Sequence, residues 1–198
     1  FLPMKKILLL IIFIILSGKN TLAFEKKAED FIVQTTSNAK KIILNTKIDE
    51  KEKRKNLEQL ALDTVDVSGL AKYTLGEYSK TLSEKQILEF VEIFKIFFSK
   101  NISNKLKDYS DQNVIITGSK KISDNYVLVN SKIISNKDKQ EIIVDWRVFL
   151  VNNNLIIRDL VVEGLSLART QREEFASIIA NKGYDNLIAS LKEYISKN

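Results

Sequence analysis

Carboxylates on neighbouring strands are the side chains of this sequence best suited to acid–base chemistry. Asp145, Asp159 and Glu163 are expected on neighbouring strands, and paired carboxylates hydrolyse glycosides when they flank the scissile bond. A register that pairs Trp146 with Leu160 spreads Asp145 and Asp159 along the polar face of the sheet. It also gives Asp159 an ion pair with Arg147, which indicates a structural role. The sequence therefore argues against an enzyme of this class.

Composition excludes several other chemistries. The 198 residues include no histidine and no cysteine, so the chain offers no imidazole base, thiol nucleophile or soft metal site. It also has no G-x-x-x-x-G-K-[ST] or G-x-G-x-x-G motif for a nucleotide. We therefore expect no catalytic residue, no metal and no cofactor.

Export is predicted from residues 1–23. Lys5 and Lys6, after the only methionine, precede ten apolar residues, 7–16, and a small-residue stretch ending at Ala23, the order of a cleaved signal peptide. Ten apolar residues are too few for a bilayer, which needs about 20. We expect cleavage after Ala23, with residues 1–3 upstream of the start, and a single periplasmic domain over residues 24–198.

The charge pattern does not predict a nucleic-acid partner. The formal charge of +6 includes three lysines from residues 1–23, a segment without acids, so residues 24–198 carry +3. Lysines alternate with acids, as over residues 49–55, which is typical of a solvated helix face. Weak attraction to an anionic membrane surface is consistent with this balance.

Apolar residues carry the stronger signal, above all in a helix expected from Glu84 to about Asp108. A capping box, Ser83 to Gln86, opens it. Its apolar face is wider than the usual core-facing arc, so something apolar must cover the extra width. The residues of this face are Ile87, Phe90, Val91, Ile93, Phe94, Phe97, Phe98 and Ile102.

Period-two patterning after Asn113 predicts an antiparallel meander. The four runs are 114–117, 126–134, 142–150 and 155–162, separated by residues 118–119, 136–138 and 152–154. A three-asparagine loop at 152–154 pairs Trp146 with Leu160 and Val144 with Val162, which keeps one face apolar. A loop of even length would place Asp159 and Glu163 on that face instead.

Helical periodicity surrounds the strands. Helices are expected over residues 28–43, from about Asp49, from an Asp66 cap to Gly76, around Phe175 up to Gly183, and from an Asp185 cap to the end. Gly164 is expected to serve the turn from the last strand to the next helix. The fold class is α+β: a twisted antiparallel sheet of about four strands with amphipathic helices packed on one face.

Three blocks of the sequence resemble the MlaC family over essentially all of residues 24–198. They are V-D-V-S-G-L-A-K-Y-T-L-G at 65–76, V-D-W-R-V at 144–148 and I-R-D-L-V-V-E-G-L-S-L-A at 157–168, the last followed by Arg172 and Phe175. The resemblance implies a periplasmic phospholipid carrier of the lipid-asymmetry (toluene-tolerance) transport system, with a tail-binding cavity. It also implies two partners, an inner-membrane ABC transporter complex and an outer-membrane lipoprotein complex, reached through transient contacts.

The physical interpretation leads to the same function. Exposing a sixteen-carbon tail to water costs about 12 kcal/mol, so a carrier must replace that burial with an apolar cavity. Other readings are a carrier of a fatty acid or solvent, or a structural or adaptor domain with a filled core. The residues expected to bind lipid are Leu70, Tyr73, Leu75, Phe90, Phe94, Phe97, Phe98, Val144, Trp146, Val148, Leu160, Val162 and Leu165.

Overall fold

Helices come first along the chain, then a sheet, then two more helices. The computed structural model describes the backbone of residues 4–107 and 109–198, and the side chains from residue 23 onwards apart from Asp108. The helices are α1 (Met4–Leu44), α2 (Glu50–Thr64), α3 (Val67–Leu75), the 3-10 turn η1 (Gly76–Lys80), α4 (Glu84–Leu106), α5 (Leu167–Lys182) and α6 (Tyr184–Lys197). The α+β class expected from the sequence is confirmed.

The strands form one antiparallel sheet in chain order. They are β1 (Gln112–Ser123), β2 (Tyr126–Ser135), β3 (Glu141–Val151), β4 (Asn154–Val162) and the short β5 (Leu165–Ser166). The expected end of the first strand at Thr117 was wrong, because β1 continues through a bulge between Ile116 and Gly118. A bulge absorbs one unpaired residue without ending the ladder, and glycine often marks one.

The β3–β4 hairpin has the predicted register but not the predicted loop. Trp146 pairs with Leu160, and Val144 pairs with Val162, as expected. The connection, however, is a two-residue turn at Asn152 and Asn153, whose φ angles of 49° and 63° suit asparagine. Arg158 supplies the extra residue as a bulge, and this bulge restores the register that a three-residue loop would have given.

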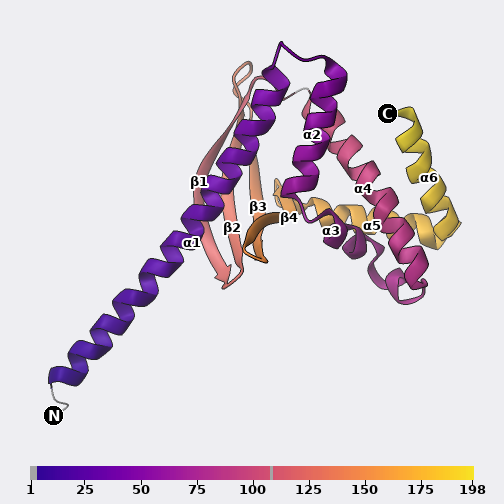
Figure 1. Cartoon of the computed structure of the whole chain (residues 1–198). Coiled ribbons are helices and arrows are strands. Elements are labelled where there is room, and N and C mark those ends of the chain that lie inside the picture. The colour runs from indigo at the N-terminus through magenta and orange to yellow at the C-terminus, as the bar shows by residue number, and fades with distance from the viewer. Residues whose placement is uncertain (1–3, 108) are drawn as a thin grey trace.

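Helix α1 lies across one face of the sheet, over β1 and β2 (Figure 1). Glu29 Oε1 accepts a hydrogen bond from Ser119 Oγ at 2.7 Å, and Glu25 accepts one from the backbone N–H of Lys121 at 2.7 Å. The N-terminal part of α1 extends well beyond the sheet (Figure 1). The predicted signal peptide falls in this part, where side chains before residue 23 lie outside the described residues, and no described helix is long and apolar enough to cross a membrane.

Side chains cap the N-termini of several helices, among them those whose caps the sequence predicted at Asp66 and Ser83. Asp49 accepts from Glu52 N and caps α2, Asp66 accepts from Gly69 N and caps α3, and Ser83 forms the capping box of α4. The expected Asp185 cap was wrong, because α6 begins at Tyr184 with Gly183 at its N-cap and no side-chain cap, and Asp185 lies in its first turn. A carboxylate there still interacts favourably with the helix dipole.

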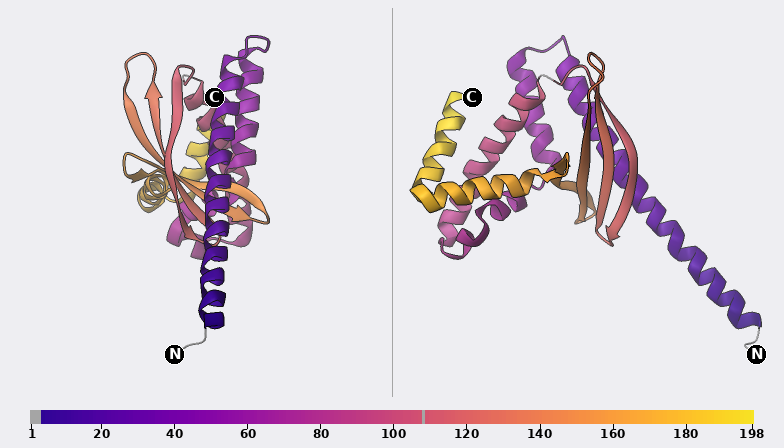
Figure 2. Two further views of the ribbon diagram at one scale, coloured as in Figure 1. Left: turned by 90° about the vertical axis from the view of Figure 1, so that its left-hand side faces the viewer. Right: turned by 180° about the vertical axis from the view of Figure 1, so that it is seen from behind.

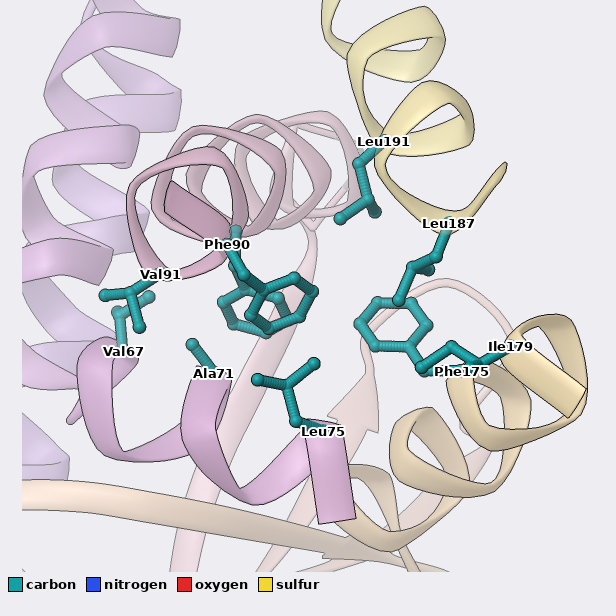
Figure 3. Close-up of a cluster of buried hydrophobic side chains, with 10 residues drawn as sticks. Val67, Ala71, Leu75, Phe90, Val91, Phe175, Ile179, Leu187 and Leu191 are labelled. Atoms are coloured by element: carbon teal, nitrogen blue, oxygen red, sulfur yellow. The ribbon is translucent and has the colours of Figure 1, made fainter. Parts of the chain in front are cut away.

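The helices α3 to α6 enclose a core of their own, beside the sheet and α1 (Figure 2). Phe90 and Phe94 of α4 face Phe175 of α5 with nearly perpendicular rings at centroid distances of 6.0 and 6.1 Å. Leu75, Leu187 and Leu191 point into the same cluster (Figure 3). Side chains of α3, α5 and α6 therefore cover part of the wide apolar face of α4.

Candidate functional site

The residues expected to bind lipid are divided between two apolar clusters. One is the helical core around Phe90 and Phe94, and the other joins the sheet to Ala28 and Ile32 of α1. Val65, between α2 and α3, packs against both clusters and forms a bridge with Ile157 of β4. The sheet residues and the phenylalanines therefore belong to different parts of the molecule.

The sheet turns one almost entirely apolar surface toward the helices, here called the apolar sheet face. Cross-strand pairs place its side chains in rows, since residues directly opposite in a sheet point to the same side. Its buried centre on β2 and β3 gives way to the half-buried Leu160 and Val162 on β4. The face comprises Val127, Val129, Ser131, Val144, Trp146, Val148, Ile157, Leu160 and Val162, and Leu165 continues it on β5.

Ser131 is the one polar residue among these positions on β2 to β5, whereas on β1 the polar Ser119 and Lys121 lie opposite Val129 and Val127. The hydroxyl of Ser131 is paired within the protein. The hydroxyl oxygen accepts a hydrogen bond from Trp146 Nε1 at 2.8 Å and donates one to the carbonyl of Val144 at 2.8 Å. Both side chains are buried, with 1% and 9% exposure. Because a buried indole N–H needs a partner, this pairing leaves the surface around Trp146 free of unsatisfied polar groups.

The phenylalanines of α4 lie among protein side chains. Phe90 and Phe94 are 0% and 1% exposed, whereas Phe97 and Phe98 are half-buried. Phe97 contacts the Tyr194 ring of α6 edge-on, at a centroid distance of 5.1 Å. These contacts describe a packed helical core, and lipid contact by these rings stays a prediction.

The expected residues of α3 point in different directions. Leu75 is buried in the helical core, Leu70 is half-buried against it, and Tyr73 is 43% exposed. The guanidinium of Arg172 lies over the Tyr73 ring, 5.3 Å from its centre. Arg172 also packs against Gly76, where a Cβ atom would come within 2.7 Å of Arg172 Nε, so this glycine makes room for the arginine.

The three carboxylates considered for catalysis each have a separate structural partner. Asp145 accepts from Asn130 Nδ2 at 2.7 Å, and Glu163 accepts from the backbone N–H of Ile143. Asp159 is buried, accepts from Ser166 Oγ at 2.6 Å and from Ala168 N at 3.0 Å, and pairs with Arg147 at 3.3 Å. Asp159 thus links β4 to the start of α5. The sequence predicted its ion pair with Arg147 but not its hydrogen bonds to Ser166 and Ala168.

The outer face of the sheet carries polar pairs and an aromatic stack. Tyr126 and Phe149 stack with ring centroids 4.4 Å apart, and burial raises the pKa of the Tyr126 hydroxyl. Arg158, the bulge residue, covers Phe149 and pairs with Asp66 at 2.8 Å. Asp66 therefore caps α3 and links it to β4, which the sequence pattern did not reveal because the bulge was not predicted.

A groove of about 370 Å³ lies between α1 and α2, apart from the apolar sheet face. Five of its seven lining residues have polar or charged side chains, and the groove is open to solvent, so it is not the enclosed apolar cavity expected for an acyl chain. The lining residues are Asn38, Lys41, Ile42, Asn56, Gln59, Leu60 and Asp63. The enclosed apolar cavity expected from the sequence therefore stays a prediction, and the apolar sheet face is its best-defined wall.

These features define an α+β fold in which one apolar sheet face is turned toward helices, and in which Asp145, Asp159 and Glu163 each have a separate structural partner. The family model described as MlaC protein matches residues 30–193, so the chain belongs to the MlaC family. Its similarity to a solved structure supports the same fold. The phospholipid-binding protein from Ralstonia solanacearum, solved in complex with a phospholipid, matches with a TM-score of 0.72 and 18% identity, over 86% of this chain and 97% of that one.

Two curated relatives match over a smaller share of the two chains. The intermembrane phospholipid transport system binding protein MlaC of Haemophilus influenzae is 25% identical over 126 residues, 62% of this chain and 59% of that protein. The toluene tolerance protein ttg2D of Pseudomonas putida is 22% identical over 130 residues, 65% of this chain and 60% of that protein. The matched segments thus span about three fifths of the length of these relatives.

Proposed function

We propose that this protein is a periplasmic carrier that binds phospholipid by its acyl chains and moves it through the aqueous space between two membranes. The observation that carries the proposal is the apolar sheet face, which is continuous over β2, β3 and β4 and whose single hydroxyl is paired internally. A surface without free polar groups suits an acyl chain and offers nothing to a polar metabolite.

Membership of the MlaC family supports the same conclusion. One relative is named as a phospholipid transport binding protein, and the structural neighbour was solved with a phospholipid. A carrier of this kind needs burial rather than catalysis, because about 0.8 kcal/mol per CH₂ opposes exposure of the chain to water. The separate partners of Asp145, Asp159 and Glu163 agree with a protein that does no acid–base chemistry.

Export by a cleaved signal peptide is part of the proposal. Residues 5–16 have the basic and apolar order of such a peptide. We expect the exported protein to begin at Phe24, which the intact mass of protein recovered from the periplasmic fraction measures. A mass that includes residues 4–23, with the protein in the membrane fraction, would contradict the assignment.

The proposed partners are an inner-membrane ABC transporter complex and an outer-membrane lipoprotein complex, as the family resemblance implies. Their contacts would be transient, since a carrier must leave each membrane after exchange. We therefore expect no partner to copurify in a fixed ratio at physiological salt.

Extraction of the purified protein with organic solvent, followed by mass spectrometry, tests the cargo. We expect phospholipid of mixed head group, in proportions that follow the host membrane, because the proposed contacts are with the chains. A fatty acid or another apolar solute as the main species would favour the alternative carrier. Protein purified without any bound apolar molecule, and unable to take one up, would favour the structural reading.

A further inference from the structure

Exposure changes steadily along one row of the apolar sheet face. The row runs across the strands from Ser131 to Val144, then Val162, then Leu165, each paired with the next. Ser131 and Val144 are 1% and 3% exposed, Val162 is half-buried, and Leu165 is 68% exposed. At its other end the row reaches Ile116 of β1, which is half-buried on the strand that α1 covers. The apolar surface therefore opens to solvent at β5.

Leu165 is the most exposed large apolar side chain among the residues that the structure describes. Leu167, two residues later, is 46% exposed. Isolated exposed leucines are ordinary on protein surfaces, but Leu165 ends a row that begins in the buried core, and Leu167 follows it at the start of α5. The exposure of Leu165 at this position therefore needs an explanation, whereas that of a scattered surface leucine does not.

The backbone holds this edge in place. Glu163 and Gly164 form a tight turn with φ angles of 49° and 80°, and β5 pairs with β4 through Leu165 and Ser166. Asp159 then binds Ser166 Oγ and the N–H of Ala168. Backbone pairing and the hydrogen bonds of Asp159 thus hold the exposed leucines in a defined position at this edge of the sheet.

We propose that the β4–β5 edge is the portal through which acyl chains reach the apolar sheet face, with Leu165 as its apolar rim. The occupant is the acyl chain of a lipid in passage, because the rim is continuous with the surface proposed to hold the chain. This inference rests on the proposed function. A lipid tail that slides along the row exchanges one apolar contact for the next and avoids full exposure to water.

The test is the rate at which lipid reaches Trp146, the only tryptophan of the chain. Delipidated full-length protein is mixed with phosphatidylcholine vesicles whose acyl chains carry bromine, and quenching of Trp146 fluorescence is followed in time. The variant Leu165→Asp removes the rim contact. The matched control is Ile115→Asp, which adds the same charge at a 48% exposed position on the outer face of the sheet.

Leu165→Asp is expected to slow quenching about fourfold, the factor that corresponds to losing one methylene contact in transit. Ile115→Asp is expected to follow the wild-type rate, and the portal is judged by the rate of quenching rather than by its final extent. The uncharged variant Leu165→Ser is expected to slow quenching as well, which separates lost apolar contact from added charge.

Equal rates for Leu165→Asp and the wild type would overturn the portal. A reduced final extent at an unchanged rate would also overturn it, since Leu165 would then help to hold bound lipid without affecting its entry. If the wild type shows no quenching at all, the proposed function fails, and that result is distinct from failure of the portal.

Discussion

Enlarging one side chain at two places on the apolar sheet face distinguishes a lipid-binding wall from a filled core. Leu160 is half-buried beside Trp146, at the β4 side of the face, whereas Val148 is 0% exposed at its centre. We therefore compare Leu160→Trp with Val148→Trp. The first would place an indole in the space proposed for an acyl chain, and the second would force it into close-packed protein.

The expected costs follow from this difference in packing. Overpacking at Val148 is expected to cost about 1–3 kcal/mol, which corresponds to a fall in melting temperature of about 2–12 °C for a domain of this size. At Leu160 the change in stability is expected to stay within about 0.5 kcal/mol, or roughly 2 °C, because the new ring replaces lipid rather than protein contacts. Lipid content is expected to fall severalfold in Leu160→Trp.

Thermal unfolding and solvent extraction of the same preparations measure both quantities. Unfolding is measured on delipidated protein, because bound lipid raises the melting temperature by mass action. A Leu160→Trp variant as destabilised as Val148→Trp, and still carrying a full complement of lipid, would refute the placement of lipid at this face. The binding site would then have to be sought at the half-buried phenylalanines of α4.

Two further substitutions test the polar ties described above. Ser131→Ala removes the acceptor of the Trp146 indole N–H and is expected to lower the free energy of unfolding in urea by about 1–3 kcal/mol. Ser131→Thr keeps the hydroxyl and is expected to recover most of this loss. Equal stability of the two variants would contradict the pairing. Asp159→Ala leaves the buried N–H of Ala168 without its acceptor and is expected to cost a similar amount, whereas a loss below about 0.5 kcal/mol would show that Asp159 contributes no more than a surface ion pair.

Local rules predicted much of this fold from the sequence. Caps at Asp66 and Ser83 and the change of period after Asn113 give the order and type of the elements, because each depends on residues close in the chain. The pairing of Trp146 with Leu160 was also predicted, since one face had to stay apolar. The bulge at Arg158 was not, because a bulge and a longer loop give the same pattern of alternation.

The candidate site was predicted less completely, because it depends on contacts between distant segments. Periodicity marked the wide apolar face of α4 but could not say that Phe175, Leu187 and Leu191 cover part of it. Ser131 was missed for a similar reason. A serine in an alternating strand reads as a solvent-facing residue, and only the position of the Trp146 ring shows that its hydroxyl is buried and paired.

Equilibrium quenching of Trp146 by lipid with bromine on its acyl chains tests the central claim most directly. This residue is the only tryptophan of the chain, so the signal comes from one known position on the apolar sheet face. The account predicts that chain-brominated phospholipid quenches the delipidated protein to a plateau at stoichiometric lipid, and that the same lipid without bromine does not. Full binding of brominated phospholipid with unchanged Trp146 emission would contradict it.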